Sequence, residues 1–248
     1  MADISPRCSN HVETFCEKYR IPSGILELLI SRDCLDCVKC YILFCEKGNI
    51  KIKFYPNERG YIPIHFAIFK ERMDMFEFLI PFCSLEDLTR KSPKTGDTLL
   101  HFASKSENPE YLKILLGLIL EKGLIPKDDM FRDFLGYTPL YYTIYSDNIE
   151  NVELLLKIRF LDGFRFNIND VDFKGNSILH MYVQNYWPNR KITLEFLVEE
   201  LSQDGIYLDL NIRNQDGKTA LDVATYEEDI EYLTKISSLT KTKKAKGV

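Results

Sequence analysis

The chain has 248 residues, of which 45% are hydrophobic and 28% charged, and its formal net charge is −5 at pH 7. This is the composition of a soluble folded protein with a substantial core, and the acidic balance argues against direct binding of nucleic acid. The sequence contains no apolar run long enough to span a membrane and no start typical of a signal peptide, so we expect a cytoplasmic protein, with the nucleus as a further compartment.

The N-terminal part of the chain is marked by its cysteines. Residues 1–22 form a lead segment, and residues 25–45 have the spacing of a capping pair of helices. The second helix of this pair carries Cys34, Cys37, Cys40 and Cys45. We interpret these cysteines as small apolar residues that pack in the core. The alternative is a metal- or redox-sensing cluster, which the absence of any nearby histidine except His11 disfavours.

From residue 60 onward a short phrase recurs five times, with its glycines 36 to 42 residues apart. Each copy has a glycine, a small apolar stretch and then a histidine or a residue in its place; the copies span residues 60–67, 96–103, 136–141, 175–180 and 217–224. A repeat of this period is typical of a stacked solenoid, in which each unit packs on its neighbours. We therefore look for the function in what the surface of the solenoid binds, rather than in a reaction.

Each phrase predicts the start of a short helix. Thr98, Thr138 and Thr219 stand where a hydroxyl caps a helix N-terminus, and Pro63 and Pro139 occupy first-turn positions. After a polar break, leucines and aromatic residues at spacings of three and four predict second, amphipathic helices over residues 73–82, 111–120, 149–158 and 192–201. The polar stretch before each next glycine has the composition of a hairpin tip.

The recurring phrase resembles the Thr-Pro-Leu-His-x-Ala motif of the ankyrin-repeat family. The resemblance implies an all-α solenoid of about six helix-turn-helix units with β-hairpin-like loops, over residues 23–239. It places the units near 24–59, 60–95, 96–135, 136–174, 175–216 and 217–239, ahead of a basic, disordered tail at 240–248. It also implies that the histidines tie neighbouring loops together by hydrogen bonds. The residues given structural roles in the motif are Gly60, Pro63, His65, Gly96, Thr98, His101, Gly136, Thr138, Pro139, Gly175, His180, Gly217 and Thr219.

Every repeat is longer than the usual ankyrin unit of about 33 residues. The additional residues lengthen the returns at 121–133, 159–166 and 202–208, and one insert, 185–190, separates two paired helices. We leave open whether these inserts are ordered or bind a partner.

We find no catalytic motif, and adjacent carboxylates such as Glu199 and Glu200 point about 100° apart on a helix. We therefore expect a non-enzymatic protein without a metal or cofactor. Hairpin tips and inner helices of such a solenoid form its binding face. The partner-binding residues predicted on this basis, together with two from the 185–190 insert, are Arg59, Tyr61, Lys94, Asp97, Arg132, Tyr137, Phe173, Lys174, Asn176, Trp187, Arg190 and Lys218.

The first functional hypothesis is therefore an intracellular module that binds another protein through its concave face. A second is a cytoplasmic inhibitor of a Rel/NF-kappa-B-type transcription factor. Residues 96–101, Gly-Asp-Thr-Leu-Leu-His, resemble the phrase that opens the repeats of that inhibitor group. The group's phosphodegron is absent, however, and the phrase lies in the middle of the array.

Overall fold

The computed structural model describes residues 26, 29, 30, 32, 34–49, 52–57, 59–123, 131–158, 167–184, 190–203 and 206–245. They belong to two compact units, residues 1–124 and 125–248. In the described part of the chain, β pairing is limited to one isolated antiparallel bridge between Val171 and Ser177. The expectation of an all-α repeat fold is confirmed.

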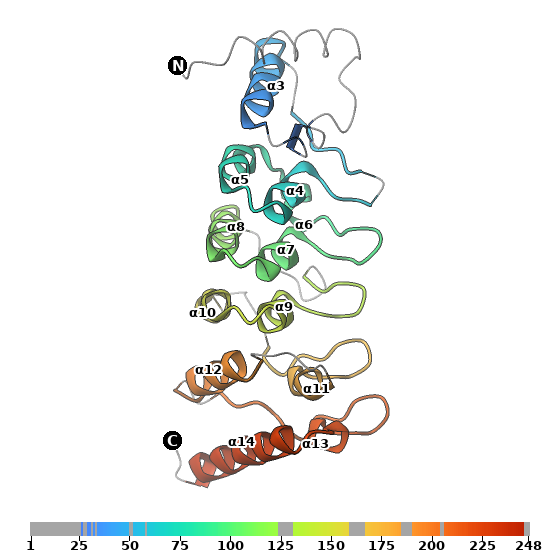
Figure 1. Ribbon diagram of the computed structural model, residues 1–248, viewed down its shortest axis with the longest axis vertical. Coiled ribbons are helices and arrows are strands. Elements are labelled where there is room, and N and C mark those ends of the chain that lie inside the picture. The colour runs from blue at the N-terminus through green and yellow to red at the C-terminus, as the bar shows by residue number, and fades with distance from the viewer. Residues whose placement is uncertain are drawn as a thin grey trace. The chain divides into compact units, whose positions relative to one another are not determined.

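The described residues of the first unit include seven helical elements (Figure 1). They are α3 (Leu35–Lys47), α4 (Pro63–Phe69), α5 (Met73–Leu79), the 3-10 helix η1 (Ile80–Phe82), α6 (Leu85–Thr89), α7 (Leu99–Lys105) and α8 (Pro109–Glu121). The first helices α4 and α7 pack on each other and each packs on its own second helix, α5 or α8. Figure 1 shows the hairpin loops of this unit projecting on the side of the first helices.

The second unit repeats this arrangement in three pairs. These are α9 (Pro139–Tyr145) with α10 (Ile149–Ile158), α11 (Ile178–Gln184) with α12 (Arg190–Gln203), and α13 (Ala220–Val223) with α14 (Glu227–Ala245). The hairpins of this unit also lie on the side of its first helices (Figure 1). We number the hairpins by their bonded residues: 57–61 and 92–97 in the first unit, and 133–137, 172–176 and 214–218 in the second.

The first helices are only one to two turns long, too short to be stable alone. Capping residues at their N-termini and burial of their apolar side chains both stabilise these helices. The Thr138 hydroxyl accepts a hydrogen bond from the backbone N–H of Tyr141, and the Thr219 hydroxyl accepts one from Asp222. In the first unit, Leu99, Leu100 and Ala103 of α7 are fully buried. Burial of this apolar face supplies most of the stabilisation.

The second helices form the core of each unit. Phe76 of α5 meets Tyr111 of α8 edge to face, with ring centroids 4.9 Å apart. In the second unit, Leu155 of α10 and Leu197 of α12 are buried. The predicted amphipathic helices over 73–82, 111–120, 149–158 and 192–201 are therefore confirmed to within a few residues.

Three features differ from the sequence-based expectations. Helix α6 was not expected; Ser84 and Asp87 form its capping box, with the Ser84 N–H donating to the Asp87 carboxylate over 2.9 Å. Helix α14 continues to Ala245, so it includes most of the segment predicted to be a disordered tail.

The third difference concerns the cysteines at α3. Cys34 and Cys37 are joined by a disulfide at the N-terminal end of the helix, whereas Cys40, Cys45 and Cys83 are buried. Burial raises the pKa of the Cys45 thiol above its ordinary value. The expected apolar packing therefore describes Cys40 and Cys45 but not Cys37. Within the described residues, no group of three or more His, Cys, Asp and Glu side chains could hold a metal ion.

Candidate protein-binding surface

Four of the numbered hairpins are shaped by an Asn or Asp three residues before the glycine, whereas hairpin 92–97 has Ser92 four residues before Gly96. In hairpin 133–137, Asp133 Oδ1 accepts hydrogen bonds of 2.8 Å from the backbone N–H groups of both Leu135 and Tyr137. Asn57, Asp172 and Asn214 make the same pair of bonds in their hairpins. Each following glycine has a positive φ, which favours glycine. These residues were not predicted from the sequence, although their constant offset from the glycine is a visible signal.

In the second unit, hydrogen bonds join each hairpin to the next. The Phe173 N–H donates to the Leu135 carbonyl oxygen, and the Gln215 N–H donates to the Lys174 carbonyl oxygen, both over 2.9 Å. His180 adds a contact of 2.9 Å between Nε2 and the Lys218 carbonyl oxygen. The expected tie from histidine to a neighbouring loop is thus confirmed for His180.

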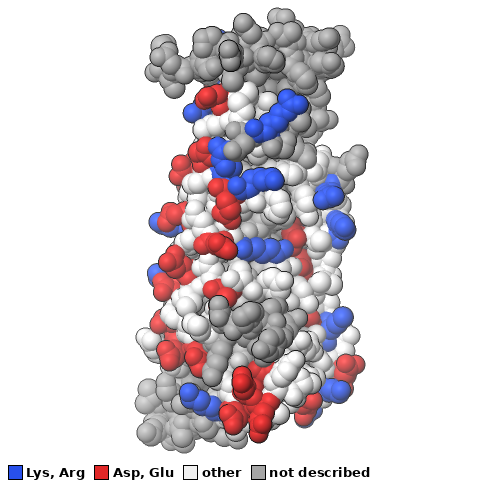
Figure 2. Space-filling view, in the orientation of Figure 1, with Lys and Arg blue, Asp and Glu red and all other residues white. Residues whose placement is uncertain are grey.

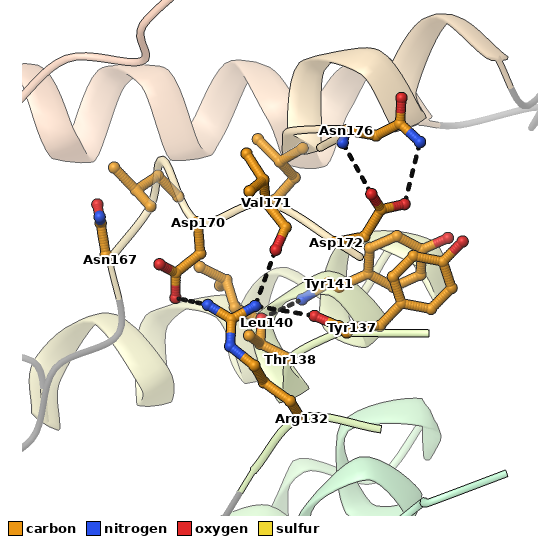
Figure 3. A pocket seen from close by; sticks show the side chains of 13 residues that line it. Arg132, Tyr137, Thr138, Leu140, Tyr141, Asn167, Asp170, Val171, Asp172 and Asn176 are labelled. Atoms are coloured by element: carbon orange, nitrogen blue, oxygen red, sulfur yellow. Dashed lines mark hydrogen bonds and ion pairs between the residues drawn. The ribbon is translucent and has the colours of Figure 1, made fainter. Parts of the chain in front are cut away.

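Arg132 is the main side chain that joins hairpins 133–137 and 172–176 (Figure 3). Its guanidinium pairs with the Asp170 carboxylate at 2.9 Å and donates to the carbonyl oxygens of Gly136 and Val171 at 3.0 and 2.9 Å. Only 16% of the side chain is exposed. Arg132 therefore connects repeats, whereas the sequence analysis placed it among residues projecting toward a partner.

Tyrosine side chains cover the first-helix side of this junction. The rings of Tyr137 and Tyr141 stack with centroids 3.7 Å apart, as Figure 3 shows. The Tyr142 hydroxyl donates to the Asp133 carboxylate over 2.7 Å. Burial, followed by the hydrogen bond to Tyr137, raises the pKa of Tyr141 above its ordinary value. Tyr137 is half-buried against these rings, so only part of it is available to a partner.

The first unit has a hollow beside hairpin 57–61, with a volume of about 370 Å³. We call it the aromatic hollow; its lining residues are Asn57, Arg59, Tyr61, His65, Phe66, Phe69 and Phe102. Phe69, at the end of α4, is 68% exposed. The Tyr61 ring meets Phe102 edge to face at 5.2 Å, across the junction of two repeats. The predicted residues Arg59 and Tyr61 therefore lie together here, whereas Phe66, Phe69 and Phe102 were not anticipated.

His65 in this unit differs from His180. Its Nδ1 accepts a hydrogen bond from the Ile62 N–H over 3.2 Å, which assigns the ring proton to Nε2. His65 Nε2 is buried and has no hydrogen-bond partner within the described residues, and its ring lies 4.8 Å from that of Phe102. The expected loop-to-loop hydrogen bond is therefore wrong for His65. Burial lowers the pKa of His65 to about 3, so the ring stays neutral.

The remaining predicted site residues fall into three groups. Lys94, Phe173, Lys174 and Lys218 are exposed at hairpin tips, as expected. Asp97 is only 5% exposed and contacts Thr95 and Lys105, so its expected projection is wrong. Asn176 is half-buried and engaged with Asp172 and Asn214. The side chains of Trp187 and Arg190, with most of the insert at 185–190, lie outside the described residues.

Charge is unevenly distributed over the first unit. On the hairpin edge of this unit, at the right of Figure 2, basic side chains are visible, whereas acidic and basic side chains alternate over its second helices. This contrast matters because the whole chain is acidic. The hairpin edge is therefore a local basic area on an acidic protein.

Comparison with known families agrees with this architecture. Residues 26–124 and 91–170 match the family model described as ankyrin repeats in three copies. The chain therefore belongs to the ankyrin-repeat family, and the resemblance seen in the recurring phrase is confirmed.

Individual relatives are distant. A putative ankyrin repeat protein of Acanthamoeba polyphaga mimivirus is 23% identical over 72% of this chain, and one of Rickettsia felis is 27% identical over 45%. Human inversin is 21% identical over 77% of the chain. The chain spans only 23%, 34% and 19% of the lengths of these three relatives.

Among solved structures, the crystal structure of an ankyrin repeat protein superposes with a TM-score of 0.62 at 18% identity. The match covers 89% of this chain and 96% of that chain. At this identity the likeness concerns the fold alone. No helix in the described ranges is long and apolar enough to cross a membrane.

Proposed function

We propose that this protein binds a partner protein through the side of its repeats that carries the hairpins and first helices. Ankyrin repeats generally mediate protein–protein interaction, and the family is typically non-enzymatic. The choice of face is our own inference. It is supported by where this chain exposes aromatic side chains.

Exposed aromatic side chains are concentrated on one side of the repeats. In the part of the chain that the structure describes, they are Tyr55, Phe69, Phe134, Tyr145, Phe173 and Tyr226. Tyr55 lies two residues before hairpin 57–61, and Phe134 and Phe173 lie in hairpins 133–137 and 172–176. Phe69 and Tyr145 lie at the ends of first helices. None of the six belongs to a second helix. Aromatic residues dominate the energetics of protein interfaces, so this bias favours the hairpin side as the binding face.

The inhibitor hypothesis gains no support from its motif. Asp97, Thr98 and His101 are all buried in the first unit. His101 Nδ1 accepts a hydrogen bond from the Thr98 N–H over 3.0 Å, which closes the start of α7. Residues 96–101 are therefore used for packing, and they give no reason to prefer a transcription factor over another protein.

Affinity capture from a lysate of the source cells, read by mass spectrometry, tests the proposed face. One variant, Phe173→Ser with Lys174→Glu, changes two exposed tip side chains; a second, Phe69→Ser, changes the aromatic hollow. The control, Leu120→Ser, changes an exposed apolar residue on second helix α8. We expect a partner to be retained by wild type and the control and lost by at least one hairpin-side variant. Equal retention by all four proteins, each with unchanged circular dichroism, would contradict the proposed face.

A further inference from the structure

The aromatic hollow has the chemistry of a site for one kind of partner segment. We propose that it binds an acidic stretch of a partner chain that inserts one large apolar side chain among the rings of Tyr61, Phe69 and Phe102. This inference rests on the proposed function, because it names the partner chemistry for the first unit's share of that face.

The rings provide the apolar part of the site. Tyr61 meets Phe66 and Phe102 edge to face, with centroids 6.5 and 5.2 Å apart, so the three rings form walls of fixed orientation. Phe69 stands at the open side and is largely exposed. The volume of about 370 Å³ lies within the range of about 300 to 1,000 Å³ typical of binding pockets. A large apolar side chain can therefore be enclosed without displacing the rings.

Cations border the rings. Arg59 lines the hollow and is exposed. Lys70 Nζ lies 5.5 Å from the Phe69 ring centroid, and Lys105 Nζ lies 5.6 Å from that of Phe102. Each of the two rings therefore has a positive charge beside it.

Negative charge is scarce at the same place. None of the described lining residues is acidic. The Asp97 carboxylate lies 3.4 Å from Lys105 Nζ, but it is buried and also accepts a hydrogen bond from Thr95. The hollow is thus basic on a chain of net charge −5, and charge complementarity selects an acidic partner segment over a basic one.

Three labelled peptides of equal length test this inference by fluorescence anisotropy on the full chain. The first carries a central tryptophan flanked by glutamates, the second has alanine in place of the tryptophan, and the third has lysines in place of the glutamates. We expect the first to bind about tenfold more tightly than either of the others, with affinity that falls as salt is raised. Equal binding of all three, or tightest binding of the lysine peptide, would overturn the proposal.

Two substitutions locate the binding. Phe69→Ser removes an exposed ring without opening the core, and we expect it to weaken the first peptide about tenfold. Arg59→Glu should weaken it by a similar factor at low salt. The matched control is Lys113→Glu, which reverses an exposed cation on second helix α8, outside the hollow, and binding should stay within about twofold. If Phe69→Ser and Arg59→Glu bind like wild type, the hollow is not the site.

The peptide and lysate experiments can fail separately. Suppose that a lysate partner is lost with the Phe173→Ser, Lys174→Glu variant, but that none of the three peptides binds the protein. This result would support the proposed function and overturn the inference about the hollow. Tight binding of the acidic peptide, abolished by Phe69→Ser, would sustain the inference even if no lysate partner depends on the second unit's hairpins.

Discussion

The two units are built from the same repeat but join their hairpins differently. In the second unit, the residues that follow Asp172 and Asn214 donate backbone hydrogen bonds to the preceding hairpin. The corresponding residue in the first unit, after Ser92, is Pro93, which has no N–H to donate. Pro93 instead packs on Gly60, where an added Cβ would lie 1.8 Å from its Cδ.

The consequence is a polar junction in one unit and an aromatic junction in the other. Arg132, His180 and Gln215 satisfy the groups between hairpins of the second unit. In the first unit, His65 Nε2 lies beside Phe102 and has no hydrogen-bond partner among the residues that the structure describes, and the rings border a hollow. The second residue of the hairpin is Pro93 in the first unit and Phe173 or Gln215 in the second. The junction with proline borders the hollow, whereas the junctions without it are joined by hydrogen bonds.

The substitution with the largest expected effect on stability tests how closely neighbouring hairpins pack in the second unit. Gly136 has φ +87°, and a Cβ there would lie 2.7 Å from the backbone nitrogen of Phe173. Gly136→Ala should therefore destabilise the protein by about 3 kcal/mol, through left-handed strain plus displacement of the neighbouring hairpin. Urea unfolding followed by circular dichroism measures the change.

Gly217→Ala is the control for that substitution. Gly217 has φ +73°, but its added Cβ would meet nothing within 4 Å. It should lose only the strain contribution, about 1 kcal/mol. Equal losses at both glycines would show that the hairpins of the second unit do not pack as closely as described.

The next effect tests the arginine that joins two hairpins. Arg132→Met leaves the Asp170 carboxylate and the Val171 carbonyl oxygen without this donor, at a cost of about 2 kcal/mol. Arg213 occupies the equivalent place in the last hairpin and donates to the Gly217 carbonyl oxygen over 2.6 Å, but its side chain is 63% exposed. Arg213→Met should change the urea midpoint far less. A loss at Arg213 as large as that at Arg132 would contradict an inter-hairpin role for Arg132.

A smaller effect depends on pH and belongs to the first unit. Burial holds the pKa of His65 at about 3 in the folded protein, against an ordinary value of 6.5. Below pH 6.5 the unfolded chain takes up a proton that folded His65 does not, so stability falls by up to about 1.4 kcal/mol per pH unit. The loss develops between the unfolded and folded pKa values and is absent above pH 6.5.

Unfolding of wild type and His65→Gln at pH 6.5 and pH 5.5 isolates this contribution, because the other histidines are common to both proteins. The variant should show a smaller drop between the two pH values, whatever its stability at pH 6.5. An identical drop in both proteins would mean that His65 is protonated in the folded state.

The sequence predicted the helices well because their periodicity is local. The four second helices follow from leucines and aromatic residues at spacings of three and four, and packing requires only those residues. Helix α6 was missed although Ser84-x-x-Asp87 is a capping-box pattern, since no periodic apolar stretch accompanies it. A helix with a periodic apolar face is therefore easier to predict from the sequence than a short helix marked only by its capping residues.

The site was less predictable because its contacts are not local. Arg132 reaches Val171, 39 residues away, and Asp97 is held by Lys105 on the following helix. No pattern near either residue shows these partners. Phe66 and Phe102 lie within copies of the recurring phrase, and Phe69 lies two residues after one. Nothing in the phrase shows that these rings meet Tyr61, because that meeting depends on how two repeats stack.

The smallest expected effect imitates the first unit's junction in the second. Gln215→Pro removes the N–H that donates to the Lys174 carbonyl oxygen and also the side-chain amide that donates to the Phe173 carbonyl oxygen. Gln215→Ala removes only the amide, so the difference between the two variants isolates the backbone bond. Because this bond lies at the surface, we expect the proline variant to be less stable than the alanine variant by about 1 kcal/mol. If proline is as stable as alanine, the missing N–H at Pro93 does not explain why the two junctions differ, and the edge-to-face contact of Phe102 with His65 becomes the cause.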